Sequence, residues 1–120
     1  FKDVNDKYGH VSGDKVLISL GQLLIQSVRD TDHVGRYGGE EFMVVFSNAT
    51  PEVIESKMNK ILTAFLHINY TVDKQSFNCS FSAGLASSNH HEKLSELISS
   101  ADAALYQAKE AGRSQICVDA

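Results

Sequence analysis

The chain has 120 residues, of which 42% are hydrophobic and 22% are charged, and this balance suits one globular domain with its own core. Its formal net charge of -4 argues against a protein that coats DNA or RNA, because such proteins gather Lys and Arg on one surface. The sequence shows neither a signal-peptide pattern nor the run of about 20 apolar residues that a membrane helix needs. We therefore expect a soluble, cytoplasmic chain, whether or not a parent protein carries a membrane anchor.

Apolar spacing predicts the elements of the first half. Residues 12–29 repeat apolar side chains at helical intervals, which indicates a helix with one buried face. Residues 33–37 and 41–46 are predicted to be the strands of a hairpin, and the second strand is the more apolar. Thr50 and Pro51 predict the start of another helix, with Thr50 as N-cap and Pro51 in the first helical position.

The second half predicts a further hairpin and a long helix. Residues 68–72 and 77–85 are the expected strands, joined around Asp73 and Lys74. A helix over 92–111 should end at Gly112, and residues 116–118 should add a short strand. Helices that alternate with partly hairpin-paired strands indicate an α/β or α+β class with a mixed sheet.

The segment Gly38-Gly39-Glu40-Glu41-Phe42 places two adjacent carboxylates on a tight turn between the first two predicted strands. Paired glycines allow positive φ angles, and they let a ligand approach the backbone without meeting a Cβ atom. Carboxylates suit a hard divalent cation. The pattern is compatible with phosphate chemistry and equally with an ordinary acidic hairpin turn.

Four stretches carry motifs in a definite order: residues 1–14 (FKDVNDKYGHVSGD), 29–32 (RDTD), 36–42 (RYGGEEF) and 101–113 (ADAALYQAKEAGR). Together they resemble the GGDEF family of diguanylate cyclases, in a GGEEF variant. The resemblance implies an α+β fold like that of nucleotide cyclases and polymerase palms, with a mixed, mostly antiparallel central sheet flanked by helices. It also implies that two domains face each other as a homodimer and join two GTP molecules into cyclic di-GMP, releasing two pyrophosphates.

The resemblance assigns recognition of guanine to Asn5 and Asp14. An Asn offers a donor and an acceptor, and a carboxylate can accept from guanine N1–H and N2–H together. Without the other motifs, a turn-forming Asn and an Asp that stabilises a helix start would be the simpler explanation.

Glu40 matches the acidic position that the family needs for metal binding and catalysis, and Glu41 matches its acidic neighbour. The implied cofactor is Mg2+ or Mn2+, which neutralises triphosphate charge and activates the attacking hydroxyl. Gly38 and Gly39 would let the nucleotide approach the turn. Whether Glu40 is a general base or only a metal ligand stays open.

Lys109 and Arg113 lie four residues apart near the end of the last predicted helix, on one face if the helix extends that far. The resemblance assigns both side chains to the GTP phosphates. The alternative explanation is a favourable interaction of each cation with the helix dipole.

Arg29 and Asp32 form an RxxD motif five residues before the glycine turn. The resemblance assigns them to an allosteric site at which cyclic di-GMP inhibits its own synthesis, with Arg29 binding through its planar guanidinium. Lys60 is a candidate for a further basic contact. The alternative is a solvated helix end with a local ion pair.

Family members carry an Asp-x-Asp-x segment immediately before the Phe-Lys that opens this sequence, and its leading Asp supplies another metal ligand. We therefore expect residues 1–120 to be a single GGDEF domain that is N-terminally truncated and inactive as an isolated fragment. An upstream sensor or dimerisation module is expected in the parent protein. Two other functions stay open: a cyclic di-GMP receptor with an idle active site, and a structural dimerisation domain.

Overall fold

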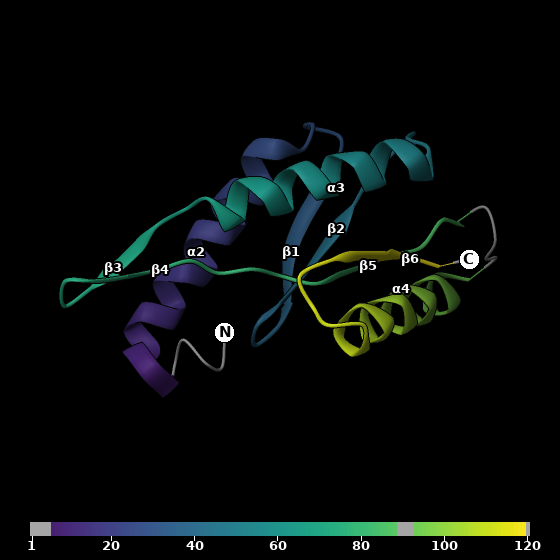
Figure 1. The fold of residues 1–120 in the computed structure, drawn as a ribbon. Coiled ribbons are helices and arrows are strands. Elements are labelled where there is room, and N and C mark those ends of the chain that lie inside the picture. The colour runs from purple at the N-terminus through teal and green to yellow at the C-terminus, as the bar shows by residue number, and fades with distance from the viewer. Residues whose placement is uncertain (1–5, 89–92, 120) are drawn as a thin grey trace. The chain divides into compact units, whose positions relative to one another are not determined.

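A computed structural model describes residues 6–88 and 93–119, and Figure 1 shows their helices and strands. The elements in chain order are α2 (His10–Ser27), β1 (His33–Gly38), β2 (Glu41–Val45), α3 (Pro51–Leu66), β3 (Tyr70–Val72), β4 (Gln75–Phe77), β5 (Ala83–Leu85), α4 (Leu94–Glu110) and β6 (Ile116–Val118). None of the helices in these ranges is both long and apolar enough to cross a lipid bilayer.

The chain forms two compact units. Unit 1 comprises Phe1–Asn48 and Ala64–Cys79, and unit 2 comprises Ala49–Thr63 and Ser80–Ala120. Unit 1 therefore contains α2 and the β1–β2 and β3–β4 hairpins, whereas unit 2 contains most of α3 together with β5, α4 and β6.

Strand pairing over the described ranges produces three two-stranded sheets rather than one continuous sheet. The β1–β2 and β3–β4 pairs are antiparallel, as the hairpin predictions required, and β5 pairs with β6 in parallel. The predicted mixture of helices with mostly antiparallel strands is confirmed.

The core of unit 1 is built on the predicted apolar face of α2. Four residues of this face are buried: Val16, Leu17, Leu20 and Leu24. Each such burial contributes about 1.5–3 kcal/mol, so this face stabilises the helix far more than intrinsic propensity does. A Cβ atom at Gly21 would lie 3.3 Å from the ring of Phe42, which shows that β2 packs closely on α2.

Helix α3 begins as predicted. The Val53 N–H donates to the Thr50 hydroxyl at 3.3 Å, so Thr50 caps the helix, and Pro51 takes the first helical position. Four apolar residues of the helix are buried: Met58, Ile61, Leu62 and Phe65.

The β3–β4 hairpin turns at Asp73 and Lys74, as predicted, but its strands are shorter than expected. The Asn78 side-chain amide donates to the carbonyls of Leu66 and Ile68 at 2.9 and 2.8 Å. These bonds replace a continued strand ladder, so β4 ends at Phe77 instead of running to residue 85.

Unit 2 contains the predicted last helix and strand. Helix α4 packs against both strands of the parallel β5–β6 sheet, and it buries Ala104 and Ala108. Gly84 in β5 has no room for a side chain, because a Cβ atom would lie 2.2 Å from Ala101 O and from Leu105 N. This close contact draws β5 into the sheet with β6 and away from the hairpin predicted for residues 68–85.

Candidate active site

The Gly-Gly-Glu-Glu turn lies at the tip of the β1–β2 hairpin. Gly38 pairs with Glu41, and the two residues between them make the turn. The register shifts between Arg36 and Gly38, which marks a bulge just before the turn. Glu40 and Glu41 are both exposed, so their carboxylates are available to a ligand.

The backbone conformation of the two turn glycines differs from the positive φ that paired glycines allow. Neither Gly38 nor Gly39 has a positive φ, so this turn contains no left-handed glycine. A Cβ atom at either position would meet nothing within 4 Å. Neither a left-handed turn conformation nor internal packing therefore requires glycine at these two positions.

Arg36 is a contributor that the sequence patterns did not identify. Its Nε donates to the Gly39 carbonyl at 3.0 Å, and its Nη2 bonds to the same oxygen. The guanidinium therefore holds the backbone of the turn through the Gly39 carbonyl. The only sequence signal was its position three residues before Gly39.

The turn suits a magnesium-type cation bound together with a nucleotide. Within the described ranges no group of three or more His, Cys, Asp or Glu side chains gathers in one place. Mg2+ commonly binds one or two carboxylates plus substrate phosphates and water, so Glu40 and Glu41 could form the part of such a ligand set that these residues supply.

Of the two residues that the resemblance assigns to guanine, only Asp14 lies in the described ranges. Asn5 lies outside the described residues. Asp14 is exposed on α2, beyond the first turn of the helix, and no side chain caps the start of that helix. The helix-start explanation of Asp14 therefore has no support in the geometry, whereas a free carboxylate suits base recognition.

Lys109 and Arg113 belong to unit 2, and they would share a helical face only if α4 extended to Arg113, which it does not. Helix α4 ends at Glu110, where Gly112 adopts a φ of 113° and the Arg113 N–H returns to the Ala108 carbonyl at 2.9 Å. This glycine-terminated capping pattern reverses the chain direction before Arg113. Both cations are exposed.

The RxxD motif forms a compact cluster in unit 1. Asp32 Oδ1 accepts from the Ser47 N–H at 3.0 Å, and Oδ2 accepts from the Arg29 N–H at 2.9 Å. The Arg29 guanidinium bonds to the same carboxylate and to the Ser47 carbonyl. The hydrogen bond from Ser47, followed by those from Arg29, lowers the pKa of Asp32 to about 2.

Exposure differs sharply between the two members of the motif. The Asp32 side chain has no exposed surface, whereas that of Arg29 is 49% exposed. Asp32 therefore ties the turn after α2 to the end of β2, and Arg29 remains accessible. This matches the ion-pair explanation for Asp32 and leaves Arg29 available to a ligand.

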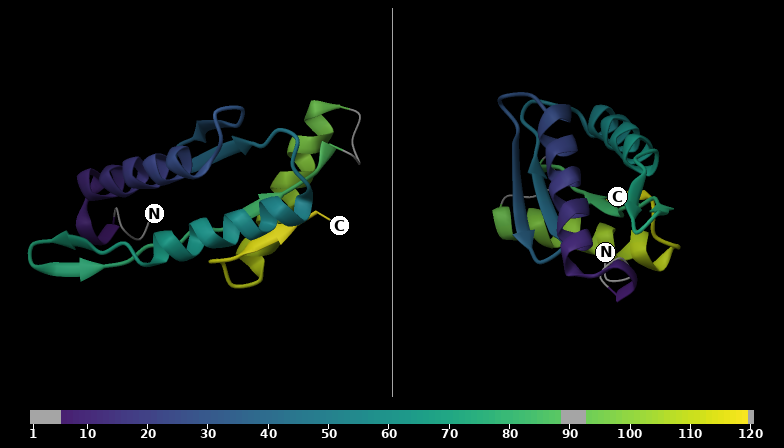
Figure 2. Two further views of the ribbon diagram at one scale, coloured as in Figure 1. Left: turned by 90° about the horizontal axis from the view of Figure 1, so that it is seen from above. Right: turned by 90° about the vertical axis from the view of Figure 1, so that its left-hand side faces the viewer.

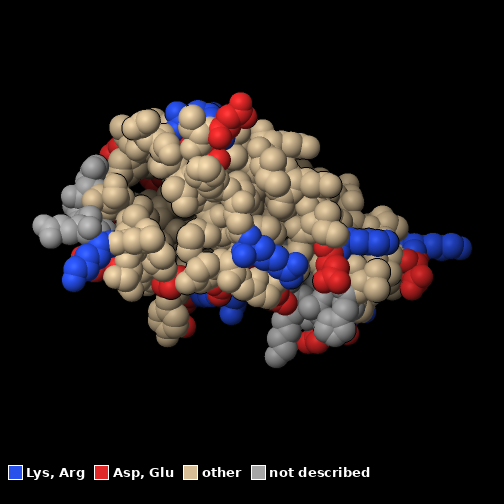
Figure 3. All heavy atoms as spheres, turned by 180° about the vertical axis from the view of Figure 1, so that it is seen from behind, with Lys and Arg blue, Asp and Glu red and all other residues tan. Residues whose placement is uncertain are grey.

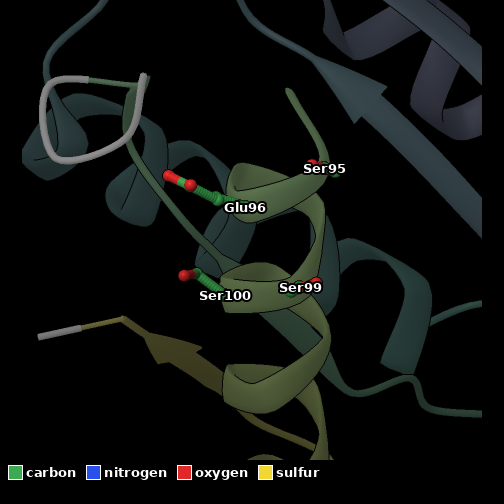
Figure 4. A pocket seen from close by; sticks show the side chains of 4 residues that line it. All are labelled: Ser95, Glu96, Ser99 and Ser100. Carbon is green, nitrogen blue, oxygen red and sulfur yellow. The ribbon is translucent and has the colours of Figure 1, made fainter. Parts of the chain in front are cut away.

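The remaining surface adds two shallow hollows. Lys60 lines one of about 480 Å3 with Ser56, Asn59 and Thr63 on α3. Another, of about 430 Å3, lies over α4, where Glu96 and Ser100 extend from one side of the helix (Figure 4). Neither contains a carboxylate pair or one of the other predicted site residues.

Charge is mixed over the visible surface. On the face drawn in Figure 3, basic and acidic side chains of the described residues are interspersed, and they do not form one basic patch. This mixture of charges agrees with the small net charge of -4.

Comparison with known proteins connects this geometry to a family. The family model described as "Diguanylate cyclase, GGDEF domain" matches residues 1–115. Diguanylate cyclase A of Treponema denticola is 32% identical over 97% of this chain and 32% of its own length. The cyclic di-GMP phosphodiesterase PdeR of Escherichia coli is 36% identical over 98% of this chain and 18% of its own length. The chain thus spans a third or less of these curated relatives.

Solved GGDEF domains share the α+β fold. The GGDEF domain of DgcB from Caulobacter crescentus, in complex with c-di-GMP, has a TM-score of 0.94 at 26% identity, over 98% of this chain and 71% of that chain. The active GGEEF domain of a diguanylate cyclase from Vibrio cholerae has a TM-score of 0.90 at 29% identity, over 99% and 76%. The chain therefore belongs to the GGDEF family of diguanylate cyclase domains.

Proposed function

We propose that this chain is the catalytic domain of a diguanylate cyclase, which condenses two GTP molecules into cyclic di-GMP and two pyrophosphates. The observation that carries the proposal is the exposed Gly-Gly-Glu-Glu turn, where both glycines leave open space and both carboxylates face solvent. Membership of the GGDEF family supports this reading of the turn.

Each group has a defined task in the proposed reaction. Asn5 and Asp14 bind guanine, and Lys109 and Arg113 bind the phosphates. Gly38 and Gly39 admit the nucleotide to the turn.

Glu40 and Glu41 would hold Mg2+ or Mn2+, which when bound offsets triphosphate charge. The bond from Arg36 to the Gly39 carbonyl would hold the backbone of the turn that carries these carboxylates.

The proposed reaction needs two copies of the domain. Each 3'-hydroxyl attacks the α-phosphate of the partner's GTP, a phosphodiester forms, the bond to the β-phosphate breaks, and the hydroxyl proton is released. Activity therefore requires a homodimer, and an upstream sensor or dimerisation module would supply its control.

We further propose product inhibition through the RxxD motif. The half-exposed Arg29 guanidinium is suited to bidentate contacts with a guanine edge or a phosphate of cyclic di-GMP. Asp32 is bonded internally, so in this structure it holds Arg29 in place. Its direct contact with product would require exchange of the bonds to Ser47 and Arg29.

The test is to incubate the complete gene product that contains this chain with GTP and Mg2+ and to identify products by mass spectrometry. Cyclic di-GMP is the expected product. GTP left intact by a folded, dimeric protein would contradict the proposal.

A cyclic di-GMP receptor is the second candidate. It is favoured by the likeness to a phosphodiesterase, PdeR, and to a domain crystallised with c-di-GMP. Binding of cyclic di-GMP without turnover of GTP would support the receptor, and binding combined with turnover would support the regulated cyclase.

A further inference from the structure

The turn that follows α4 holds three successive residues in the left-handed region of the backbone. Gly112 has a φ of 113°, Arg113 one of 62° and Ser114 one of 53°. Glycine reaches this region freely, but at Arg113 and Ser114 the conformation is costly, because the Cβ atom crowds the following carbonyl oxygen. Two such residues in succession persist only where their surroundings fix them. Figures 1 and 2 show this turn leading from α4 into the yellow strand β6.

Hydrogen bonds around the helix end supply the first set of restraints on this turn. The Arg113 N–H donates to the Ala108 carbonyl at 2.9 Å. The Gln115 side-chain amide reaches back and donates to the carbonyls of Ala111 and Arg113, at 3.0 and 3.2 Å. One amide group therefore ties together the residues before and after Gly112.

The segment before β5, which also belongs to unit 2, supplies the second set of restraints. The Ser114 N–H donates to the Ser82 hydroxyl at 3.1 Å, and the hydroxyls of Ser114 and Ser80 share a hydrogen bond. Ser80 and Ser82 are half-buried, whereas Ser114 is exposed. The exposed turn is thus tied to a more buried support. We call Ser80, Ser82 and Gln115 the clamp residues.

Arg113 lies in the middle of this strained turn and is itself exposed. Its N–H bonds to Ala108 and its carbonyl accepts from Gln115, so its backbone is held on both sides. A guanidinium makes paired hydrogen bonds to a phosphate only in a defined orientation. Fixing the backbone from which the side chain extends reduces the conformational freedom that phosphate binding would otherwise have to remove.

We propose that the clamp residues are positioning residues for phosphate binding: they hold the left-handed backbone of Arg113 and Ser114 and so set the direction in which the Arg113 guanidinium extends from the turn. This inference rests on the proposed function, in which Arg113 binds the GTP phosphates. The clamp residues act through Arg113 and need not touch the nucleotide.

The expected size of the effect follows from the strength of one hydrogen bond. Removing such a bond shifts a local equilibrium by about two- to tenfold. Without the bond to Ser82, part of the population would relax from the strained turn to ordinary backbone angles, and the apparent GTP affinity would fall by the same factor. Because the effect acts through one side chain, it should vanish once the Arg113 guanidinium is removed.

The test measures dissociation constants of the complete gene product for the non-hydrolysable α,β-methylene analogue of GTP. Arg113→Ala should weaken binding at least about tenfold. Ser82→Ala should weaken it about two- to tenfold, whereas Ser82→Thr keeps the hydroxyl and should bind as the wild type does. In the Arg113→Ala background, Ser82→Ala should change binding less than about twofold. Ser99→Ala, at an exposed serine of α4, is the matched control.

Each result has a separate meaning. Unchanged affinity in Ser82→Ala, or the same weakening in both backgrounds, would overturn the positioning role while leaving the proposed cyclase intact. Wild-type affinity in Arg113→Ala would overturn phosphate binding by Arg113 and the positioning role together. If Ser82→Ala does not fold, Gln115→Ala removes the amide that bonds to Ala111 and Arg113, and unchanged affinity there would count against the clamp residues.

Discussion

At the scale of single residues, the turn illustrates what sequence can and cannot reveal. The residue types at Gly38–Glu41 correctly predicted an exposed acidic turn, because glycine and acidic side chains concentrate in such turns. The bond from Arg36 to the turn was not predictable, because hairpin spacing alone does not say which side chain returns to the backbone. The Ser47 bond to Asp32 spans 15 residues of chain, so no local pattern indicates it.

Gly39→Val tests the close-approach role at this scale. Because a Cβ atom at residue 39 meets nothing within 4 Å, the variant should fold with an unchanged melting temperature. Its branched side chain would occupy the space proposed for the nucleotide, so GTP affinity should fall by at least about tenfold. Calorimetric titration measures this. Gly35→Val, in the preceding strand β1 and also with open space around its Cβ position, is a matched control, and unchanged affinity in Gly39→Val would refute the role.

Asp32 makes the free energy of unfolding depend on pH in the acidic range. Its pKa is lowered to about 2 in the folded chain, against about 3.9 in an unfolded one, so its contribution is complete above pH about 4. That contribution is lost as the pH falls from about 4 towards 2. Urea unfolding at pH 6, 4 and 3 should therefore show the advantage of wild type over Asp32→Asn shrinking with acid. The exposed Asp30→Asn is the control. If the free energies of unfolding of wild type and Asp32→Asn changed with pH in parallel, the stabilising role of the Arg29–Asp32–Ser47 hydrogen bonds would be contradicted.

At the scale of elements, local sequence signals predicted the helices well, but the sequence did not predict which distant strands pair. Apolar periodicity and capping residues predicted α2, α3 and α4 to within a few residues, because these signals act over one or two turns. The parallel pairing of β5 with β6 depends on α4 packing over both strands. Such a contact between distant segments leaves no periodic trace in either segment.

Gly84→Ala tests the packing of this element. A methyl group would lie 2.2 Å from backbone atoms of α4, so either the helix or β5 must move. We expect a loss of about 3 kcal/mol or more in the free energy of unfolding, at the upper end of overpacking effects. Urea denaturation measures it, with Gly35→Ala as a control in open space. A loss below about 0.5 kcal/mol would mean that α4 does not pack against β5 as described.

At the scale of the whole molecule, the fold class followed from motif order, and it is confirmed by the solved GGDEF domains. The proposed regulation also belongs to this scale, since product bound near Arg29 must affect chemistry elsewhere. Arg29→Ala should abolish inhibition by cyclic di-GMP while retaining the uninhibited rate. Initial rates at increasing cyclic di-GMP measure this, with Asp30→Ala as control. Full inhibition of the Arg29→Ala variant by cyclic di-GMP would show that the RxxD motif is not part of the regulatory site.

The most direct test of the central claim is to quantify pyrophosphate and cyclic di-GMP together in one reaction with GTP and Mg2+. The account predicts two pyrophosphates for each cyclic di-GMP, loss of both products in Glu40→Ala, and retention of both in Glu52→Ala, a substitution at an exposed glutamate in the first turn of α3. Pyrophosphate released without cyclic di-GMP, or both products formed at the wild-type rate by Glu40→Ala, would contradict it.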